Sequence, residues 1–237
     1  MALSLKFSNS LNTTPSGYNI YSVDFNGTDE YIDLGEAKGV IDGQKGTVSA
    51  WFKIDSTNAT CTIFQARVDT NNYVNVFYHN GSTELRIAYR LGGATKIASH
   101  TVDFEGDGKF HHIYASWDAS AGAIKLGVDG TIVDTTTFSG TFTGAFANAM
   151  IAQNTLDGNY LHGKVANIGV FNRVVDISTV VVADREPLDL TGQEYLVSYY
   201  KLDEGSGVVA FDASINNNNG TLENTPTWTT DVPFKAD

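Results

Sequence analysis

The acidic residues Glu30, Asp33 and Glu36 are the nearest that this sequence comes to a catalytic pair of carboxylates. A retaining glycosidase needs two carboxyl groups about 5 Å apart, one as nucleophile and one as acid. Only every second side chain of a strand points to the same face, so a spacing of three separates these groups. We interpret them as parts of a solvated turn, and we predict that the protein is not an enzyme.

The adjacent residues His111 and His112 are the next candidates, because imidazole is a common metal ligand. Neighbouring residues of a strand point to opposite faces, so the two rings cannot chelate one ion together. We expect one packed ring and one exposed ring. The sequence shows neither a recognisable Ser-His-Asp order nor a glycine-rich phosphate loop after a strand.

Aromatic and amide side chains at loop ends are the candidates for ligand binding. Tyr73 and Tyr160 lie near the ends of predicted loops, and Asn159 stands beside Tyr160. The tryptophans fall within predicted strands and are expected in the core, where an indole contributes a large packing area; they are Trp51, Trp117 and Trp228.

Calcium is the ion that the loops suit best, because it takes six to eight oxygen ligands from carboxylates, amides and carbonyls. Asn26, Asp29 and Glu30 lie in the first predicted turn, and Asp157 lies in the loop before the last long strand. These four residues are the candidate metal ligands. The alternative is that they only shape turns, as Asn and Asp commonly do.

The composition narrows the classes of protein. The 237 residues are 42% hydrophobic and 11% aromatic, which suffices for a sizeable core. With 15 basic and 27 acidic residues the net charge is 15 − 27 = −12, and no cluster of Lys and Arg interrupts it, which argues against a nucleic-acid partner. No apolar stretch approaches the roughly 18 residues of a membrane span, and residues 1–10 do not resemble a secretory signal. A single cysteine, Cys61, excludes an internal disulfide and is expected to be buried.

The elements that must position these residues are mainly strands, because Gly, Thr, Asn, Ser and Val are abundant. Strands are expected at residues 48–54, 61–66, 72–78, 85–91, 110–117, 124–128, 150–153, 163–171 and 198–202. Asp129-Gly130 separates two apolar runs and predicts a two-residue hairpin turn, since both turn residues need positive φ. The regular spacing predicts an all-β fold in which two antiparallel sheets form a sandwich.

One short helix is expected near residues 178–186. Asp176 or Ser178 can cap its first turn, and Pro187 ends it.

The chain divides into an arm and a sandwich. Residues 1–20 carry less pattern and are interpreted as an N-terminal arm or an extra edge strand, with Leu3, Leu5 and Phe7 on one face. Residues 21–237 are expected to form the sandwich, with 195–237 as a C-terminal segment packed on it. Its apolar side chains are expected to be buried there; they include Tyr199, Leu202, Val208, Phe211 and Trp228.

Five segments resemble, in the family's order, the laminin-G-like, concanavalin-A-like jelly-roll domains. They are the opening strand pair at 21–34, the strand at 47–53, the His-His strand at 108–118, the hairpin at 125–130 and the closing strand at 161–173. The tail at 199–207 is similar to a segment that often flanks this domain. The resemblance implies a jelly roll of the kind found in phage structural proteins and bacterial glycan-binding modules. In many members calcium lies near comparable loops, whereas the Glu-x-Asp-x-x-Glu pattern of the family's glucanases is absent here.

Two functions remain open. The main interpretation is a virion structural protein, such as a capsid decoration, head fibre or tail appendage. Its arm would dock to capsid or tail proteins, homo-oligomers would be an option, and a glycan would be a secondary partner. The alternative is a secreted or surface carbohydrate-binding module of a bacterium, located outside the cell or on its surface.

Overall fold

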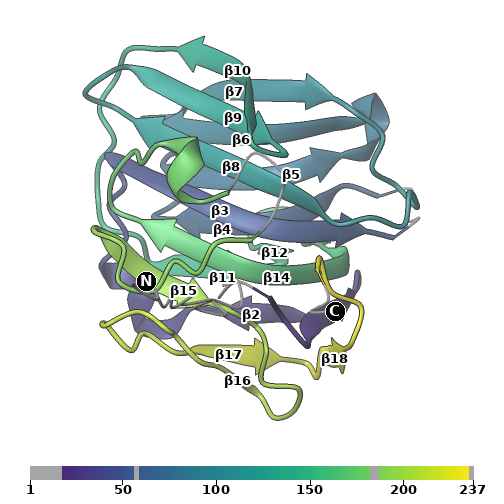
Figure 1. Ribbon diagram of the computed structural model, residues 1–237. Coiled ribbons are helices and arrows are strands. Elements are labelled where there is room, and N and C mark those ends of the chain that lie inside the picture. The colour runs from purple at the N-terminus through teal and green to yellow at the C-terminus, as the bar shows by residue number, and fades with distance from the viewer. Residues whose placement is uncertain (1–17, 56–58, 182–186, 235–237) are drawn as a thin grey trace, which may run out of the picture.

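Two antiparallel sheets pack face to face in the computed structural model, which describes residues 18–55, 59–181 and 187–234 (Figure 1). The sequence prediction of a two-sheet sandwich with a concanavalin-A-like jelly roll is confirmed. No helix among the described residues is long and apolar enough to cross a membrane.

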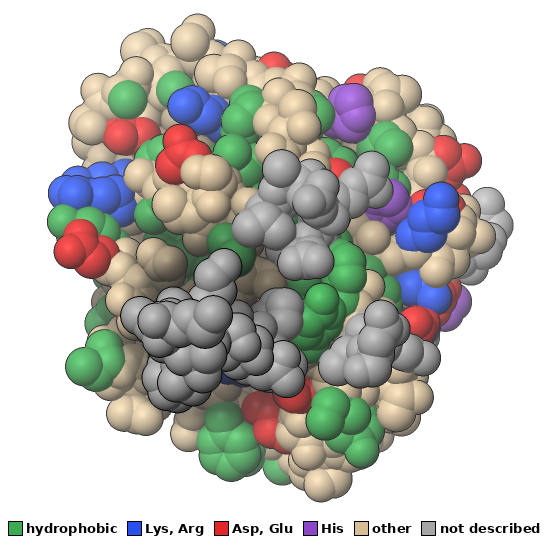
Figure 2. Space-filling model, in the orientation of Figure 1, with side chains coloured by type: hydrophobic (Ala, Val, Ile, Leu, Met, Phe, Trp, Pro, Cys, Tyr) green, Lys and Arg blue, Asp and Glu red, His purple; other side chains and the backbone are tan. Residues whose placement is uncertain are grey.

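The first sheet faces the viewer in Figure 1. Its strands run in the order β10 (Thr131–Thr137), β9 (Ala123–Val128), β8 (His111–Asp118), β3 (Lys45–Ile54), β14 (His162–Phe171), β1 (Ser22–Asn26) and β18 (Thr227–Thr229), and β15 (Leu196–Tyr200) also pairs with β14. On the same side of the molecule, Figure 2 shows Lys and Arg side chains spread towards the rim rather than gathered in one patch.

The second sheet lies behind the first. Its order is β16 (Val209–Ala210), β17 (Gly220–Glu223), β2 (Tyr31–Asp33), β11 (Asn148–Ile151), β4 (Cys61–Arg67), β5 (Tyr73–His79), β6 (Glu84–Leu91) and β7 (Ala94–Thr101). A separate two-stranded hairpin consists of β12 (Gln153–Asn154) and β13 (Asn159–Tyr160).

The core lies between the sheets, because apolar residues recur with period two along their strands. Val74, Val76 and Tyr78 of β5 are fully buried in it, as are Cys61 and Trp117. The sheets are also joined at one edge, where the Ser99 amide of β7 donates to Asp134 Oδ2 of β10 over 2.8 Å. This edge contact fixes the end of the sandwich that carries β6 and β7.

The Asp129-Gly130 hairpin is confirmed. It joins β9 to β10, and the two turn residues have φ values of 48° and 81°.

The opening strand pair is divided between the two sheets. β1 belongs to the first sheet and β2 to the second, so the two strands do not pair with each other. The turn between them includes Gly27 at φ 75°, and it carries the chain from one sheet to the other. The alternation of apolar and polar residues is the same whether the two strands lie in one sheet or in two, so it cannot indicate to which sheet each strand belongs.

Of the predicted helix near 178–186, only residues 178–181 are described, and they hold the end of a 3₁₀ turn and no α-helix. Within the described residues there are only the 3₁₀ turns η1 (Gly35–Gly39), η2 (Asn80–Ser82) and η3 (Ile177–Thr179). Asp176 does cap η3, since its carboxylate accepts from the Ser178 amide over 2.9 Å. The β-branched residues Val180 and Val181 then disfavour helix, and Val181 forms a bridge with Pro187 instead. Residues 182–186 lie outside the described part.

The C-terminal segment contributes strands to both sheets. β18 pairs with β1, β17 pairs with β2, and Tyr199 and Leu202 are fully buried. The expectation that Val208 and Phe211 are buried is wrong, since they are 54% and 58% exposed. Most of the predicted arm lies outside the described residues.

Candidate functional site: the outer face of the second sheet

Strands β4 to β6 turn a row of side chains away from the core, and we call this surface the outer face of the second sheet. On β5 these residues alternate with the core residues and are Tyr73, Asn75, Phe77 and His79. The neighbouring strands add Thr62, Gln65 and Arg67 on β4, and Glu84, Arg86, Ala88 and Arg90 on β6. The face therefore combines arginines, amides and aromatic rings.

The strand register places these side chains in rows. Tyr73 is the cross-strand partner of both Arg67 and Arg90. Since neighbouring strands lie about 4.8 Å apart, the Cα atoms of the two arginines are roughly 10 Å apart with Tyr73 between them. In the next row, Asn75 is flanked by Gln65 and by the small side chain of Ala88.

Buried polar atoms without a partner gather on this face. Among the described residues, seven buried side-chain nitrogen or oxygen atoms make no hydrogen bond to another described residue. Four of the seven belong to the outer face, and they are Thr62 Oγ1, Arg67 Nε, Asn75 Oδ1 and Arg90 Nε. Native proteins leave few buried polar atoms unsatisfied, so such a concentration needs an explanation.

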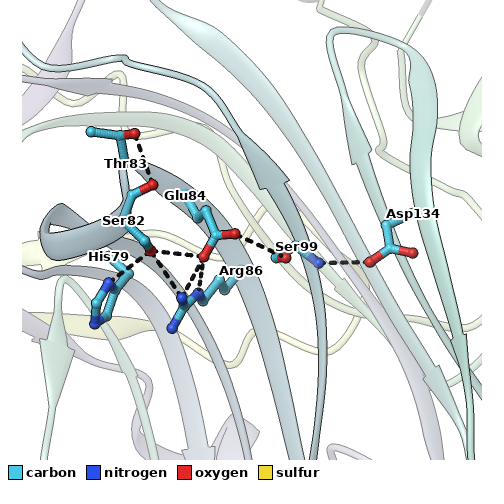
Figure 3. Close-up of polar contacts among 7 residues, drawn as sticks. All are labelled: His79, Ser82, Thr83, Glu84, Arg86, Ser99 and Asp134. Atoms are coloured by element: carbon cyan, nitrogen blue, oxygen red, sulfur yellow. Dashed lines mark hydrogen bonds and ion pairs between the residues drawn. The ribbon is translucent and has the colours of Figure 1, made fainter.

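Towards the opposite end of the same face, the Arg86 guanidinium has partners within the fold, as Figure 3 shows. Arg86 donates from Nε to Glu84 Oε2 over 2.9 Å and from Nη2 to Ser82 Oγ over 2.9 Å. Ser82 Oγ also donates to Glu84 Oε2 over 2.7 Å, and His79 contacts Ser82. Hydrogen bonds from Ser82 and Arg86 lower the pKa of Glu84, so this carboxylate is charged and neutralises Arg86.

The predicted ligand-binding residues are divided between this face and its neighbourhood. Tyr73 lies on the face. Asn159 and Tyr160 form strand β13, and Gln153 Nε2 donates to Tyr160 Oη over 2.9 Å. No hydrogen bond or ring contact between described residues joins Tyr160 to Tyr73.

The β12–β13 hairpin is nevertheless attached to the outer face. Gln65 of β4 donates to Asn154 Oδ1 over 2.7 Å and accepts from the Thr155 amide over 3.0 Å. Gln65 is only 1% exposed as a result. Ligand binding by Tyr73, Asn159 and Tyr160 stays a prediction.

The candidate metal ligands are occupied by turn contacts. The Asn26 amide donates to Glu30 Oε2 over 2.7 Å, and Asn26 Nδ2 donates to Asp29 Oδ1 over 3.0 Å. Asp157 Oδ2 accepts from Asn154 Nδ2 over 3.2 Å. Burial of Glu30 raises its pKa.

In the described ranges no three His, Cys, Asp or Glu side chains are grouped to hold a metal ion. A calcium site here would need additional carbonyl and amide oxygens, and it stays a prediction.

The expectation of one packed and one exposed histidine is wrong. His112 is fully buried and His111 is 8% exposed. His112 faces outward from the first sheet, but it packs against Trp51, which Phe234 and Val181 cover. The local pattern could not show that a later segment covers this side of the sheet.

Ser49 Oγ lies 2.8 Å from His112 Nε2 in the structure. The sequence did not reveal this pair. Burial lowers the pKa of His112 to about 3, and its Nδ1 has no hydrogen-bond partner among the described residues. Ser49 is 2% exposed. The pair is enclosed, and no carboxylate orients the ring through Nδ1, so it does not have the arrangement of a hydrolase triad.

Sequence reasoning missed Arg67, Asn75 and Arg90 as functional candidates. A partial signal was present, since Arg86 and Arg90 alternate with the apolar residues of β6 and so define its polar face. The alternation does not reveal the strand register, which places Arg67 and Arg90 on either side of Tyr73.

The chain belongs to the concanavalin A-like lectin/glucanases superfamily, whose laminin-G-type member family matches residues 26–180. A search of curated proteins finds no relative.

Solved structures share the fold. A candidate carbohydrate-binding protein from Bacteroides ovatus is 17% identical with a TM-score of 0.64, and the match covers 89% of this chain and 60% of that one. The CBM40 module of the Ruminococcus gnavus IT-sialidase, bound to α2,3-sialyllactose, is 15% identical with a TM-score of 0.53, over 68% of this chain and 96% of that one. A pentraxin from Limulus polyphemus has the same identity and TM-score over 68% and 82%. At such identities the likeness establishes the fold alone.

Proposed function

We propose that this protein is a non-enzymatic carbohydrate-binding module whose ligand lies on the outer face of the second sheet. The observation that carries this proposal is the concentration of four buried, unpaired polar atoms on that face. Each such atom costs about 1–3 kcal/mol when it is left unsatisfied. A ligand that supplies the missing partners removes this cost, after side-chain rotamer changes of the kind that are common at binding interfaces.

The chemistry of the face suits a sugar. Carbohydrates present hydroxyl groups at their edges and C–H groups on their ring faces, so they need hydrogen-bonding groups beside an aromatic ring. Tyr73 and Phe77 supply half-buried rings, and Asn75 between them on β5 supplies an amide. A few polar groups beside apolar surface are the usual composition of a small-molecule site.

The structural neighbours support the same choice, since they include a carbohydrate-binding module in complex with a sialylated sugar. They favour the carbohydrate-binding alternative over attachment to a virion, for which neither they nor the family match gives support. We accordingly propose a glycan as the partner, and the outside of the cell or its surface as the location.

The test is a glycan microarray followed by titration calorimetry on the full chain. We expect the double variant Tyr73→Ala/Asn75→Ala to lose binding while it keeps its thermal unfolding temperature within a few degrees. Phe211→Ala is the control, because it removes an aromatic ring away from this face, in the tail segment. Unchanged binding by the double variant, or no glycan binding by the native protein, would overturn the proposal.

A further inference from the structure

We infer that the glycan bound on this face carries an anionic group, a carboxylate or a sulfate, which is held between Arg67 and Arg90. This inference rests on the proposed function and specifies the class of ligand.

The two arginines are uncompensated cations in an acidic protein. The net charge is −12, yet no hydrogen bond or ion pair joins either guanidinium to any described residue. Only their Nε atoms are both buried and unsatisfied, so the Nη atoms, which also lack partners, remain accessible to a ligand. In contrast, Arg86 lies on the same strand as Arg90 and is neutralised by Glu84.

One acidic side chain lies near Arg67 but does not bond to it. Asp69 lies close enough to sense the charge of Arg67, but its Oδ1 accepts from the amides of Asn71 and Asn72 over 2.8 Å and 2.9 Å. The hydrogen bond from the Asn71 amide makes the largest contribution to lowering the pKa of Asp69, and Arg67 makes the smallest. Asp69 therefore shapes its turn through Oδ1, and no hydrogen bond or ion pair joins it to Arg67.

The turns at this end of the sheet hold the site in place. The Gly93 amide donates to the Asn71 carbonyl over 3.0 Å, and the Gly92 amide donates to Asn72 Oδ1 over 3.0 Å. These bonds join the β4–β5 turn to the β6–β7 turn beside the arginines. A site held by such contacts loses little conformational entropy when a ligand binds.

The arrangement matches an acidic sugar. A guanidinium offers a planar fork of donors that fits two oxygens of a carboxylate or sulfate. With Tyr73 midway between Arg67 and Arg90, a sugar ring lying on the phenol has its substituents within reach of long side chains from both neighbouring strands. A neutral sugar would leave both cations without a counter-charge.

The experiment compares matched pairs of probes by calorimetry: oligogalacturonate with its methyl ester, 3′-sialyllactose with lactose, and 3′-sulfolactose with lactose. We expect the acidic member of at least one pair to bind at least 10-fold more tightly, and to weaken as salt is raised. The first two pairs report on carboxylate and the third on sulfate. Equal binding of acidic and neutral members would overturn the inference and leave the proposed function standing.

Variants separate this site from a general effect of charge. We expect Arg67→Ala and Arg90→Ala each to weaken the acidic probe about 10- to 100-fold, as loss of a charge-assisted hydrogen bond predicts. Arg90→Lys should recover only part of the loss, because it keeps the charge without the fork. Arg173→Ala is the control, since it makes the same change of charge after β14 of the first sheet, where Arg173 stacks on Tyr195. If Arg173→Ala weakens binding as much as Arg90→Ala, the arginine pair is not the anion site.

Discussion

The outer face of the second sheet has two ends that use the same residue type in opposite ways. At the end near η2, Arg86 is enclosed by Glu84 and Ser82 and has partners for its donors. At the other end, Arg67 and Arg90 flank Tyr73 and have none among the described residues. Both ends lie on the same strands, and Arg86 and Arg90 both face outward from β6.

The difference follows from where carboxylates are placed. Glu84 is two residues from Arg86 on the same strand face, so its side chain meets the guanidinium directly. The equivalent positions around Arg90 hold Ala88 and the neutral residues Tyr73 and Thr95. An arginine that its own fold neutralises contributes to structure, whereas one left without a partner is available for a ligand.

The largest effect is expected from giving the open end its own carboxylate. Asn75→Asp is nearly isosteric and sets a negative charge diagonally beside Arg67 and Arg90. We expect binding of the acidic probe to fall by roughly 100-fold or more, as an internal partner competes for both cations. Calorimetry measures the loss, and a thermal melt should show an unchanged or higher unfolding temperature. A variant that still binds the acid would show that the two ends do not differ in this way.

His111 is a second cation with carboxylate partners, and like Arg86 it is expected to stabilise the fold. His111 contacts Asp129 over 3.0 Å and Asp107 over 2.8 Å. Burial opposes the charge on this ring, but the hydrogen bonds to both carboxylates outweigh it, and the pKa of His111 is raised above 6.5.

Because the pKa is raised, the stabilisation is fully present below about pH 6.5 and is lost as the pH rises through the raised value. We expect His111→Gln to lower the free energy of unfolding by about 1 kcal/mol in acid, after allowance for solvent screening, and by less in base. Urea titrations at both pH values give the two differences. A difference that grows with pH would have the wrong sign for a charged His111.

The smallest effect is expected at the satisfied end. Arg86→Ala removes an ion pair whose side chains are 21% and 20% exposed, and it should lower the free energy of unfolding by about 0.5 kcal/mol. Arg90→Ala, which breaks no interaction with a described residue, should leave it unchanged or slightly higher. Parallel urea titrations compare the two variants. A larger loss for Arg90→Ala would mean that this arginine has a structural role.

Much of the fold could be predicted because its signals are local. Period-two apolar runs located the strands, and Asp129-Gly130 located a hairpin whose two residues have the expected positive φ. The prediction weakened where distant parts of the chain decide the outcome. β1 and β2 went to different sheets, and His112 was covered by a segment that includes Val181.

The candidate site was less predictable than the fold. Tyr73 was identified as an aromatic residue near a loop end, but its neighbours on the face were not. Asp29 and Glu30 were identified as candidate calcium ligands. The hydrogen bonds that their carboxylates accept within the first turn depend on how the backbone folds there. A sequence shows which groups are available, and it does not show which of them are already occupied.

The sequence by itself determined the strand pattern and the hairpin turn, because each depends on residues a few positions apart, and the acidic charge, because it depends on composition alone. Only the tertiary structure decided that Arg67, Tyr73 and Arg90, spread over three strands, meet in one row. The physical reason is that burial of Val74, Val76 and Tyr78 fixes which residues of β5 face outward, whereas the turns between the strands set which neighbours those residues meet.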